Sequence, residues 1–415
     1  MDISALHLFE GYGIELEYMI VDQQTLDVMP IADQLIKEVA GSYASEIDCG
    51  RLCWSNELVL QVIELKTNGP AASLQRLDKQ FQAEANEINQ QLESYNAMLL
   101  PTAMHPWMNP DTEMKLWPHD YNPVYEAYNR IFNCRGHGWA NLQSTHINLP
   151  FDGDEEFKKL HAAVRLILPL LPAIAASSPI ADTEVKKQAN FRLHVYKNNA
   201  SKIPSVTGDV IPEQVFSKGD YEREVFQRMY RDIAPHDPDG ILQEEWLNSR
   251  GAIARFDRGS IEIRLLDIQE CPLADLAIVR IIIDTLKALV NESWSSLEDQ
   301  KRWSVQSLFN ILLHTIENAE NAKIKDNNYS RLFGFFGDVR PLTAGGLWKH
   351  LFDTLYNEEA VAADEVLQAL KAIIEKGTLS SRIKKALSIK PDKSEIKEVY
   401  RQLGQCLAEG RLFTI

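Results

Sequence analysis

The sequence predicts a mixed α+β protein built around a mainly antiparallel sheet. Segments in which apolar and polar residues alternate are interspersed with segments in which apolar residues recur every three or four positions. These are the periods of strands and of amphipathic helices. Several alternating segments have one apolar and one polar face, which is typical of an antiparallel sheet with only one face on the core. From Gln300 to the end the pattern is mostly helical, so we expect the sheet before that residue.

Five segments are expected to form strands. In Gly13–Val21, Glu15 and Glu17 share one face, while Leu16 and Tyr18 share the other. The remaining expected strands lie within Glu57–Thr67 and over Trp139–Leu149, Phe191–Lys197 and Ser260–Gln269. Each of them combines an apolar face with polar residues, so we expect them to share one sheet.

Helices are expected between and after these strands. Ser73 is a candidate N-cap for a helix that continues to about Leu100, because apolar residues follow it at spacings of three and four. Ser177–Gly240 contains many proline, glycine and charged residues, so we expect a long, partly ordered surface excursion of the kind that often forms a lid. The other expected helices are Glu155–Ala176, bent at its prolines, Pro272–Val290, and Asp392–Glu409, which ends at Gly410.

The composition argues against several classes of protein. The 415 residues include 43 Lys and Arg and 59 Asp and Glu, for a net charge of −16. This charge is unsuited to a nucleic-acid binder that uses a basic patch, or to a polybasic membrane binder. The longest apolar run, Leu166–Ala176, is about half of the ~20 residues that a membrane-spanning helix needs. No secretory leader opens the chain and no C-x-x-C pair occurs, so we expect reduced thiols and a cytoplasmic protein.

Polar residues on the expected strands are the candidates for a functional site. They are Glu15 and Glu17 on the first strand, Ser144, His146 and Asn148 on the third, Arg192, His194 and Tyr196 on the fourth, and Glu262 and Arg264 on the fifth. Each set alone is also explained by a half-exposed strand. Together they predict a polar concave surface whose carboxylates and imidazole suit Mg²⁺ or Mn²⁺ and whose arginines suit phosphate or carboxylate oxygens.

The second expected strand carries two further carboxylates, Glu57 and Glu64. They are seven residues apart, so strict alternation places them on opposite faces. Either a bulge or bend lies between them, or only one of them joins the site. Glu64 interrupts an apolar run, so it needs a partner or a cation.

Several competing catalytic signatures are absent from the sequence. It contains no G-x-x-x-x-G-K-[ST], no H-E-x-x-H, no G-x-S-x-G and no G-x-G-x-x-G after a strand. The sequence therefore gives little support to a P-loop nucleotide site or to a zinc protease.

Five motifs in order resemble the glutamate–cysteine ligase type 2 family, which includes bacterial carboxylate–amine ligases. They are G-I-E-L-E-Y, E-L-V-L-Q-V-I-E-L-K-T, S-T-H-I-N, A-S-S-P followed by Phe191-Arg192, and R-F-D-R-G-S-I-E-I-R-L-L-D. Their order and approximate spacing match from near residue 10 to near residue 290. The segment L-S-S-R-I-K-K-A-L near the C-terminus is also similar to the tail of that family.

The resemblance implies a fold similar to that of glutamine synthetase, with a curved, mainly antiparallel sheet that forms a funnel and helices behind it. Residues 1–295 would form this catalytic region, and residues 296–415 would form a helical region packed on it. Alternatively, the two regions would form one domain. The resemblance also implies six metal-binding residues: Glu15, Glu17, Glu57, Glu64, His146 and Glu262. Glu262, Arg264 and Arg192 would face ATP, with Arg264 on the phosphoryl group or acid and Arg192 near the transferred phosphate. Many bacterial members have a second histidine where this chain has Asn148.

The implied function is that of an ATP-dependent ligase that forms an amide through an acyl phosphate. ATP and Mg²⁺, or Mn²⁺, would be required. The substrates would be small molecules, with glutamate as the acid and cysteine or another amino compound as the amine, as in glutathione biosynthesis, and the chain could form a homo-oligomer. Two alternatives stay open: a two-metal hydrolase that uses the same residues, and a non-catalytic nucleotide-binding relative. The presence of all six metal-type residues and both arginines favours catalysis.

Overall fold

The computed structural model describes residues 5–337 and 342–414. Its main sheet contains β1 (Gly13–Asp22), β2 (Glu46–Asp48), β3 (Leu52–Asn56), β4 (Val62–Thr67), β5 (Ala97–Leu100), β6 (Ser144–Pro150), β9 (Ala252–Arg255) and β10 (Ser260–Asp267). The strand order is β2–β3–β4–β1–β6–β10–β9, β5 pairs with the end of β1, and each of these pairings is antiparallel. The predicted α+β class with an antiparallel sheet is therefore confirmed.

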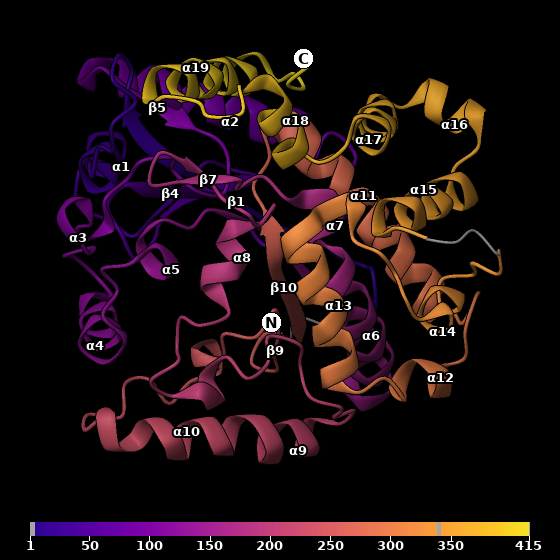
Figure 1. The fold of residues 1–415 in the computed structure, drawn as a ribbon. Coiled ribbons are helices and arrows are strands. Elements are labelled where there is room, and N and C mark those ends of the chain that lie inside the picture. Colours follow the sequence, from indigo (N-terminus) through magenta and orange to yellow (C-terminus); the bar gives the residue numbers. More distant parts are fainter. Residues whose placement is uncertain (1–4, 338–341, 415) are drawn as a thin grey trace.

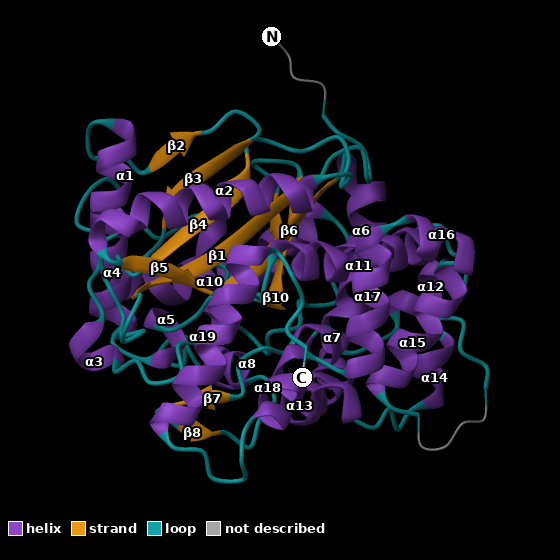
Figure 2. Cartoon of the chain, turned by 90° about the horizontal axis from the view of Figure 1, so that it is seen from above, coloured by secondary structure: helices purple, strands orange, loops and turns teal. Residues whose placement is uncertain are grey.

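One face of the sheet packs on helices α2 (Leu77–Leu92), α6 (Gly153–Ile167) and α11 (Pro272–Val290). Figure 2 shows α2 lying across the strands. Ile14 and Leu16 of β1 are fully buried, and Thr145 of β6 donates a hydrogen bond to Asp275 of α11 at 2.7 Å. Apolar residues at every second position thus form the core, which is the main source of stability in such a layer. The opposite, polar face is left for other elements to enclose.

The elements over the polar face come from two separate stretches of chain. They include α4 (Asn122–Phe132), α5 (His137–Ala140), α8 (Phe191–Tyr196) and the short 3₁₀ turn η6 (Glu245–Leu247). Figure 1 shows α4, α5 and α8 on one side of β10, with α9 (Lys218–Tyr221) and α10 (Gln227–Ile233) along the lower edge. The remaining elements before residue 200 are α1 (Ala32–Ala40), α3 (Pro110–Glu113), α7 (Pro172–Ala175) and the hairpin of β7 (Ile180–Ala181) and β8 (Glu184–Val185).

The chain after α11 is helical, as predicted. Its helices are α12 (Leu297–Lys301), α13 (Val305–Asn318), α14 (Asn327–Arg331), α15 (Ala344–Leu355), α16 (Glu358–Ala363), α17 (Glu365–Lys376), α18 (Leu379–Ala386) and α19 (Lys393–Glu409). Helix α17 packs against α11, and α19 packs against β5 and α2. A single buried core cluster contains residues from both sides of residue 295. The division into residues 1–295 and 296–415 stays a prediction.

Two helices lie where the sequence places them. Helix α11 spans Pro272–Val290, and α19 is capped by Asp392, whose side chain accepts a hydrogen bond from the backbone N–H of Glu395. Gly410 then ends α19 with a φ of 64°, a conformation that glycine adopts without strain. None of the helices described is both long and apolar enough to cross a membrane.

The segment Phe191–Lys197 is not a strand, so this prediction is wrong. Residues Phe191–Tyr196 form helix α8, whose N-cap is Asn190; its side chain accepts a hydrogen bond from the backbone N–H of Leu193 at 2.9 Å. Over six residues, the alternation of apolar and polar side chains does not distinguish a strand from one and a half helical turns. The Asn190 cap and the buried pairing of Arg192 decide in favour of the helix.

Three other boundaries also differ from the predictions. The helix expected from Ser73 to Leu100 begins at Leu77 and ends at Leu92, because Asn96 at a φ of 53° reverses the chain into β5. The segment Trp139–Leu149 contains the end of α5 before β6 begins at Ser144. Proline interrupts the helix expected over residues 155–176, which continues as a 3₁₀ turn over 168–170 and then as α7.

The segment 177–240 is more ordered than the sequence suggests. It contains α8, α9 and α10 with a π-helical turn over Glu222–Phe226. Val206, Tyr221 and Met229 are fully buried, so the segment is packed onto the rest of the protein by apolar side chains. Strand β3 (Leu52–Asn56), which the sequence analysis does not identify, adds a further strand beside β4.

Candidate functional site

The register of the central strands brings the predicted carboxylates and His146 together on the polar face. Glu15 of β1 lies opposite His146 of β6, and Glu17 lies opposite Glu64 of β4. Glu262 of β10 lies opposite Asn148 of β6. Directly opposed residues have Cβ atoms about 4.5–5.5 Å apart, so one patch of sheet collects charges from four strands.

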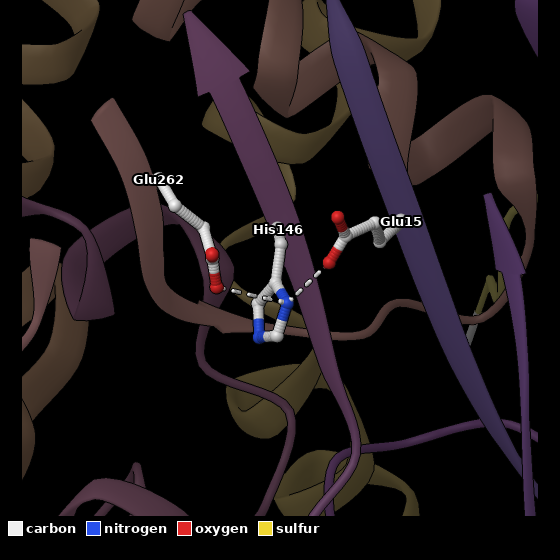
Figure 3. Close-up of side chains that lie close together, drawn as sticks. All are labelled: Glu15, His146 and Glu262. Carbon is white, nitrogen blue, oxygen red and sulfur yellow. Dashed lines mark hydrogen bonds and ion pairs between the residues drawn. The ribbon is translucent and has the colours of Figure 1, made fainter. Parts of the chain in front are cut away.

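His146 is the centre of this patch (Figure 3). Its Nδ1 lies 2.8 Å from Glu15 Oε2 and 3.7 Å from Glu262 Oε1, and its Nε2 lies 3.7 Å from Glu17 Oε1. Nε2 also bonds the Ser144 hydroxyl at 2.9 Å. Burial disfavours a charged imidazole, but the hydrogen bond to Glu15 and the surrounding carboxylates outweigh it and raise the pKa of His146 to about 9.

The carboxylates of the cluster differ in the hydrogen bonds that they accept and in their pKa values. Glu17 accepts two hydrogen bonds from Ser144, from the backbone N–H at 2.7 Å and from the hydroxyl at 3.0 Å. Burial opposes ionisation of Glu15, but its bond to His146 lowers its pKa to about 2. Burial and then the charge of Glu15 raise the pKa of Glu64 to about 7, although Ser55 donates to it at 2.5 Å. The cluster thus holds more negative charge than its protein partners neutralise.

Glu57 and Glu64 both belong to this cluster, so a bend between them is the correct alternative. Strand β3 ends at Asn56 and β4 begins at Val62, so the two glutamates lie on either side of a chain reversal and not on one strand. Strict alternation therefore does not apply to them. Burial, followed by the charges of Glu17 and Glu64, raises the pKa of Glu57 well above its ordinary value. No hydrogen bond to its carboxylate occurs within the described chain.

A bulge in β10 places Glu262, Arg264 and Asp267 on the polar face. The register shifts between Ile263 and Leu266, so Arg264 and Leu265 together oppose one residue of β6. The Nε of Arg264 lies 2.9 Å from Glu262 Oε1. Uninterrupted alternation from Glu262 would put Leu266 on the polar face. Because of the bulge, Asp267 lies there instead, opposite Ser144.

Arg192 reaches the site from α8 because it pairs with Asp267. Its Nε donates to Asp267 Oδ1 at 2.6 Å, and both side chains are buried. The other Asp267 oxygen accepts from the backbone N–H of Ser177 at 2.9 Å and from the Ser178 hydroxyl at 2.7 Å. Sequence reasoning did not identify Asp267, although an acidic residue within a buried apolar run was a signal for it.

His194 and Tyr196, the other candidates from the expected fourth strand, differ from each other in whether they line the cavity beside the cluster. His194 is half-buried and stacks on Phe191 with ring centroids 5.5 Å apart, and it does not line the cavity beside the cluster. Tyr196 lines that cavity, and its hydroxyl donates to the backbone carbonyl of Ser249 at 2.9 Å. The change from strand to helix explains the difference, because residues two apart on a helix do not share a face.

Residues of the charged cluster line two cavities. The first, of about 650 Å³, includes Glu17, Glu57, His146, Arg192 and Arg264 in its lining. The second, of about 710 Å³, is lined by Glu15, Asn148, Lys66 and the glycines Gly13, Gly69 and Gly259. The aromatic side chains of α4, α5 and η6 in the first cavity were not identified from the sequence, because the sequence pattern does not specify how these elements pack over the sheet. Lys66, although it lies within the expected strand Glu57–Thr67, and Arg255 and Arg258 were not identified either.

The donor atoms suit divalent cations. Glu15, His146 and Glu262 offer one set of ligand atoms, and Glu17, Glu64 and His146 offer another; the atoms of each set lie within 4.8 Å of one another. Carboxylate oxygens with one imidazole are typical ligands of Mg²⁺ and Mn²⁺. Asn148 Nδ2 donates to Glu15 Oε1 at 2.9 Å, so Asn148 orients the carboxylate of Glu15.

Comparisons with known proteins agree with this fold. The model of glutamate-cysteine ligase family 2 (GCS2) matches residues 12–402. An uncharacterized protein from Archaeoglobus fulgidus is 35% identical over 280 residues, which cover 68% of this chain and 75% of that protein. The structure of glutamate–cysteine ligase from Francisella tularensis in complex with AMP matches with a TM-score of 0.63 and 15% identity, over 96% of this chain and 88% of that one.

A complex of the prokaryotic ubiquitin-like protein Pup with its ligase PafA also matches, with a TM-score of 0.49 and 12% identity, over 99% of this chain and 78% of that one. The family match covers all of the central strands and most of the helical C-terminal part. The five motifs that resemble the type 2 ligases lie within the same residues. The chain therefore belongs to glutamate-cysteine ligase family 2.

Proposed function

We propose that this protein joins a carboxylate to an amine in an ATP-dependent reaction, with glutamate as the acid and cysteine or another amino compound as the amine. The observation that carries this proposal is the cluster of five glutamates and His146, whose members line two cavities, with Arg264 beside it. One cavity can hold a nucleotide and the other the acid and amine. The Francisella tularensis protein with the same fold was solved with AMP, which supports a nucleotide as one ligand.

The cluster fits the divalent cations that ATP requires. Five carboxylates surround one imidazole, and Glu57 and Glu64 have raised pKa values because burial and like charges disfavour their ionisation. We propose that Glu15, Glu17, Glu57, Glu64, His146 and Glu262 hold Mg²⁺ or Mn²⁺. Such cations would neutralise the triphosphate and stabilise charge on the transferred phosphoryl group. Without them, a triphosphate beside these glutamates would be strongly repelled.

The proposed reaction has two steps. A carboxylate oxygen of the acid attacks the γ-phosphorus of ATP, the bond to the oxygen that bridges the β- and γ-phosphates breaks, and ADP leaves. The amine nitrogen then attacks the carbonyl carbon of the acyl phosphate, the carbon–oxygen bond to phosphate breaks, and inorganic phosphate leaves with the electron pair. The nitrogen loses a proton as the amide forms. The residues of the protein position the reactants and neutralise charge.

The two arginines have different proposed tasks. Arg264 lines the first cavity and has about a quarter of its side chain exposed (27%), so its guanidinium is available to phosphoryl oxygens. Arg192 is 2% exposed and holds Asp267 through its Nε, while its Nη2 lies 3.4 Å from the Arg264 carbonyl. Arg192 therefore also fixes the bulged strand that presents Arg264.

Glu262→Gln is expected to weaken the metal dependence of ATP binding. The substitution keeps the shape of the side chain but removes one anionic ligand, so the Mg²⁺ or Mn²⁺ concentration needed for half-maximal ATP binding should rise on the order of 10-fold or more. Calorimetric titration of ATP at a series of metal concentrations measures this. The control is Glu398→Gln, which changes an exposed carboxylate paired with Arg401. Identical metal titrations for wild type and Glu262→Gln would contradict the assignment.

The experiment that tests the proposed function is acid-dependent phosphate release with hydroxylamine as the amine. With ATP, Mg²⁺ and glutamate, we expect phosphate release together with glutamyl hydroxamate, because hydroxylamine traps an acyl phosphate. Phosphate release without any acid would indicate a hydrolase. ATP binding without turnover for a panel of carboxylic acids would indicate a non-catalytic relative. Either result would overturn the proposal.

A further inference from the structure

The first cavity has a charged wall and an aromatic wall. The charged wall includes the cluster around His146 with Arg192 and Arg264, and Glu244, Arg255 and Arg258 also line the cavity. The opposite wall is made of side chains from α4, α5, α8 and η6 that no step of the ligase reaction uses. Its aromatic members on these elements are Tyr125 and Tyr128 of α4, Trp139 of α5, Tyr196 of α8 and Trp246 of η6.

One face of α4 supplies much of the aromatic wall. Tyr121, Val124, Tyr125 and Tyr128 follow one another at helical spacing, so they lie on the same side of the helix. Tyr128 packs between two tryptophans, with ring centroids 5.4 Å from Trp139 and 6.1 Å from Trp246. Tyr128, Trp139 and Trp246 therefore hold one another in place within the wall.

Trp139 and Trp246 face the cavity and are not closed inside the core, while Tyr128 lines the cavity from a buried position behind them. Trp139 and Trp246 are half-buried, in contrast to the fully buried Trp54, Trp117 and Trp348. Exposing large aromatic surface to water costs free energy that a ligand with apolar surface recovers by covering it. Rings on one side of a cavity, opposite a few placed charges, are typical of sites for amphipathic small molecules.

The thiol of cysteine is too small to cover this wall. The cavity of about 650 Å³ must hold the reacting carboxylate near Arg264 and still leaves the whole aromatic side to the second substrate. The second cavity offers Lys66, Arg258 and backbone at Gly13, Gly69 and Gly259, which can bind phosphate oxygens, beside the carboxylates of Glu15, Glu46 and Asp257, whose charge a bound cation would offset. The aromatic wall is therefore available to the amine.

We propose that the amine substrate carries an aromatic or similarly large apolar side chain, which packs on the wall of Tyr128, Trp139 and Trp246. This inference rests on the proposed ligase function and specifies its second substrate. In the amide-forming step, the nitrogen of this amine attacks the acyl-phosphate carbonyl carbon, inorganic phosphate leaves, and the nitrogen releases its proton.

A panel of amines tests this specificity. The enzyme with Mg²⁺, ATP and the acid that gives the strongest hydroxamate signal is offered alanine, cysteine, phenylalanine, tryptophan and phenethylamine, and amide products are quantified by mass spectrometry. We expect kcat/KM for the aromatic amines to exceed that for alanine and cysteine at least 10-fold. Equal or better use of cysteine or alanine would overturn the inference while leaving the ligase function intact. Failure of every acid to give hydroxamate would overturn the proposed function and, with it, this inference.

Trp246→Ala connects the specificity to the wall. We expect the ratio of kcat/KM for phenylalanine to that for alanine to fall at least 10-fold, and Trp246→Phe, which keeps a ring, to restore most of it. The control is Trp107→Ala, because Trp107 lies outside this cavity, and its ratio should equal that of wild type. If Trp246→Ala or Trp246→Phe instead raises the KM for ATP and leaves the ratio unchanged, the wall binds adenine and the inference is wrong.

Discussion

Arg264→Ala is expected to lower kcat of hydroxamate formation by roughly 10³-fold or more, since removing one preorganised charge from a phosphoryl-transfer site typically costs this much. The guanidinium lines the first cavity and lies 2.9 Å from Glu262. In the transition state, negative charge spreads over the phosphoryl oxygens, and an alanine offers no donor to them. Steady-state kinetics with ATP, Mg²⁺, glutamate and hydroxylamine measure the change.

The effect of Arg264→Ala on stability should be much smaller. Because 27% of the side chain is exposed and bound Mg²⁺ can compensate the neighbouring carboxylates, we expect the free energy of unfolding in Mg²⁺ to fall by about 1–2 kcal/mol. Arg228→Ala, which removes an exposed arginine of α10, is the control and should change neither quantity appreciably. Loss of turnover that merely follows the loss of folded protein would disprove a catalytic role for Arg264.

Arg382→Ala is expected to destabilise the protein by about 3–5 kcal/mol, the usual cost of leaving one charge of a buried pair without its partner. Arg382 of α18 and Glu270 form an ion pair in which the two side chains are 3% and 0% exposed. The same guanidinium donates to the Phe413 carbonyl at 2.8 Å and to the Gly377 carbonyl at 3.2 Å. Urea unfolding of wild type and variant measures the difference.

This pair connects the C-terminal helices to the strand that carries the site. Glu270 follows β10 by three residues, and it also accepts from the backbone N–H of Phe413 at 3.1 Å. Combining Arg382→Met with Glu270→Gln removes both charges and should recover much of the lost stability. Arg401→Ala breaks an exposed pair with Glu398 and should cost less than about 1 kcal/mol. An Arg382→Ala variant as stable as Arg401→Ala would show that the buried pair contributes little.

Much of the fold follows from local sequence patterns. The alternation in β1 and in the first half of β10 identifies which side chains face the core, because this period is a property of the extended backbone. Pro272, Asp392 and Gly410 correctly locate helix ends, since each acts through its own backbone conformation or a short-range hydrogen bond. The same local rules fail at residues 191–196, where a short segment is compatible with both periods and a buried ion pair decides.

The site was predicted in part, and its geometry required the tertiary structure. The residues Glu15, Glu17, Glu64, His146, Glu262 and Arg264 lie together as expected, and their roles in metal and phosphate binding remain a proposal. Glu57 joins them through a chain reversal. Asp267 joins through a bulge that shifts the alternation by one residue. Neither feature has a strong local signal, because both depend on pairing with strands distant in the sequence.

The sequence by itself determined several of the main elements, the polar and apolar faces of the central strands, the acidic character and the family resemblance, because these depend on residue type and on spacing along the chain. The tertiary structure decided that His146 lines one cavity while its partner Glu15 lines a second, and that aromatic side chains from α4, α5 and η6 line the first. Those rings belong to short elements far apart in the sequence, and only their packing over the sheet brings them to one wall. The physical reason is that a binding surface is made by long-range contacts, which local periodicity does not encode.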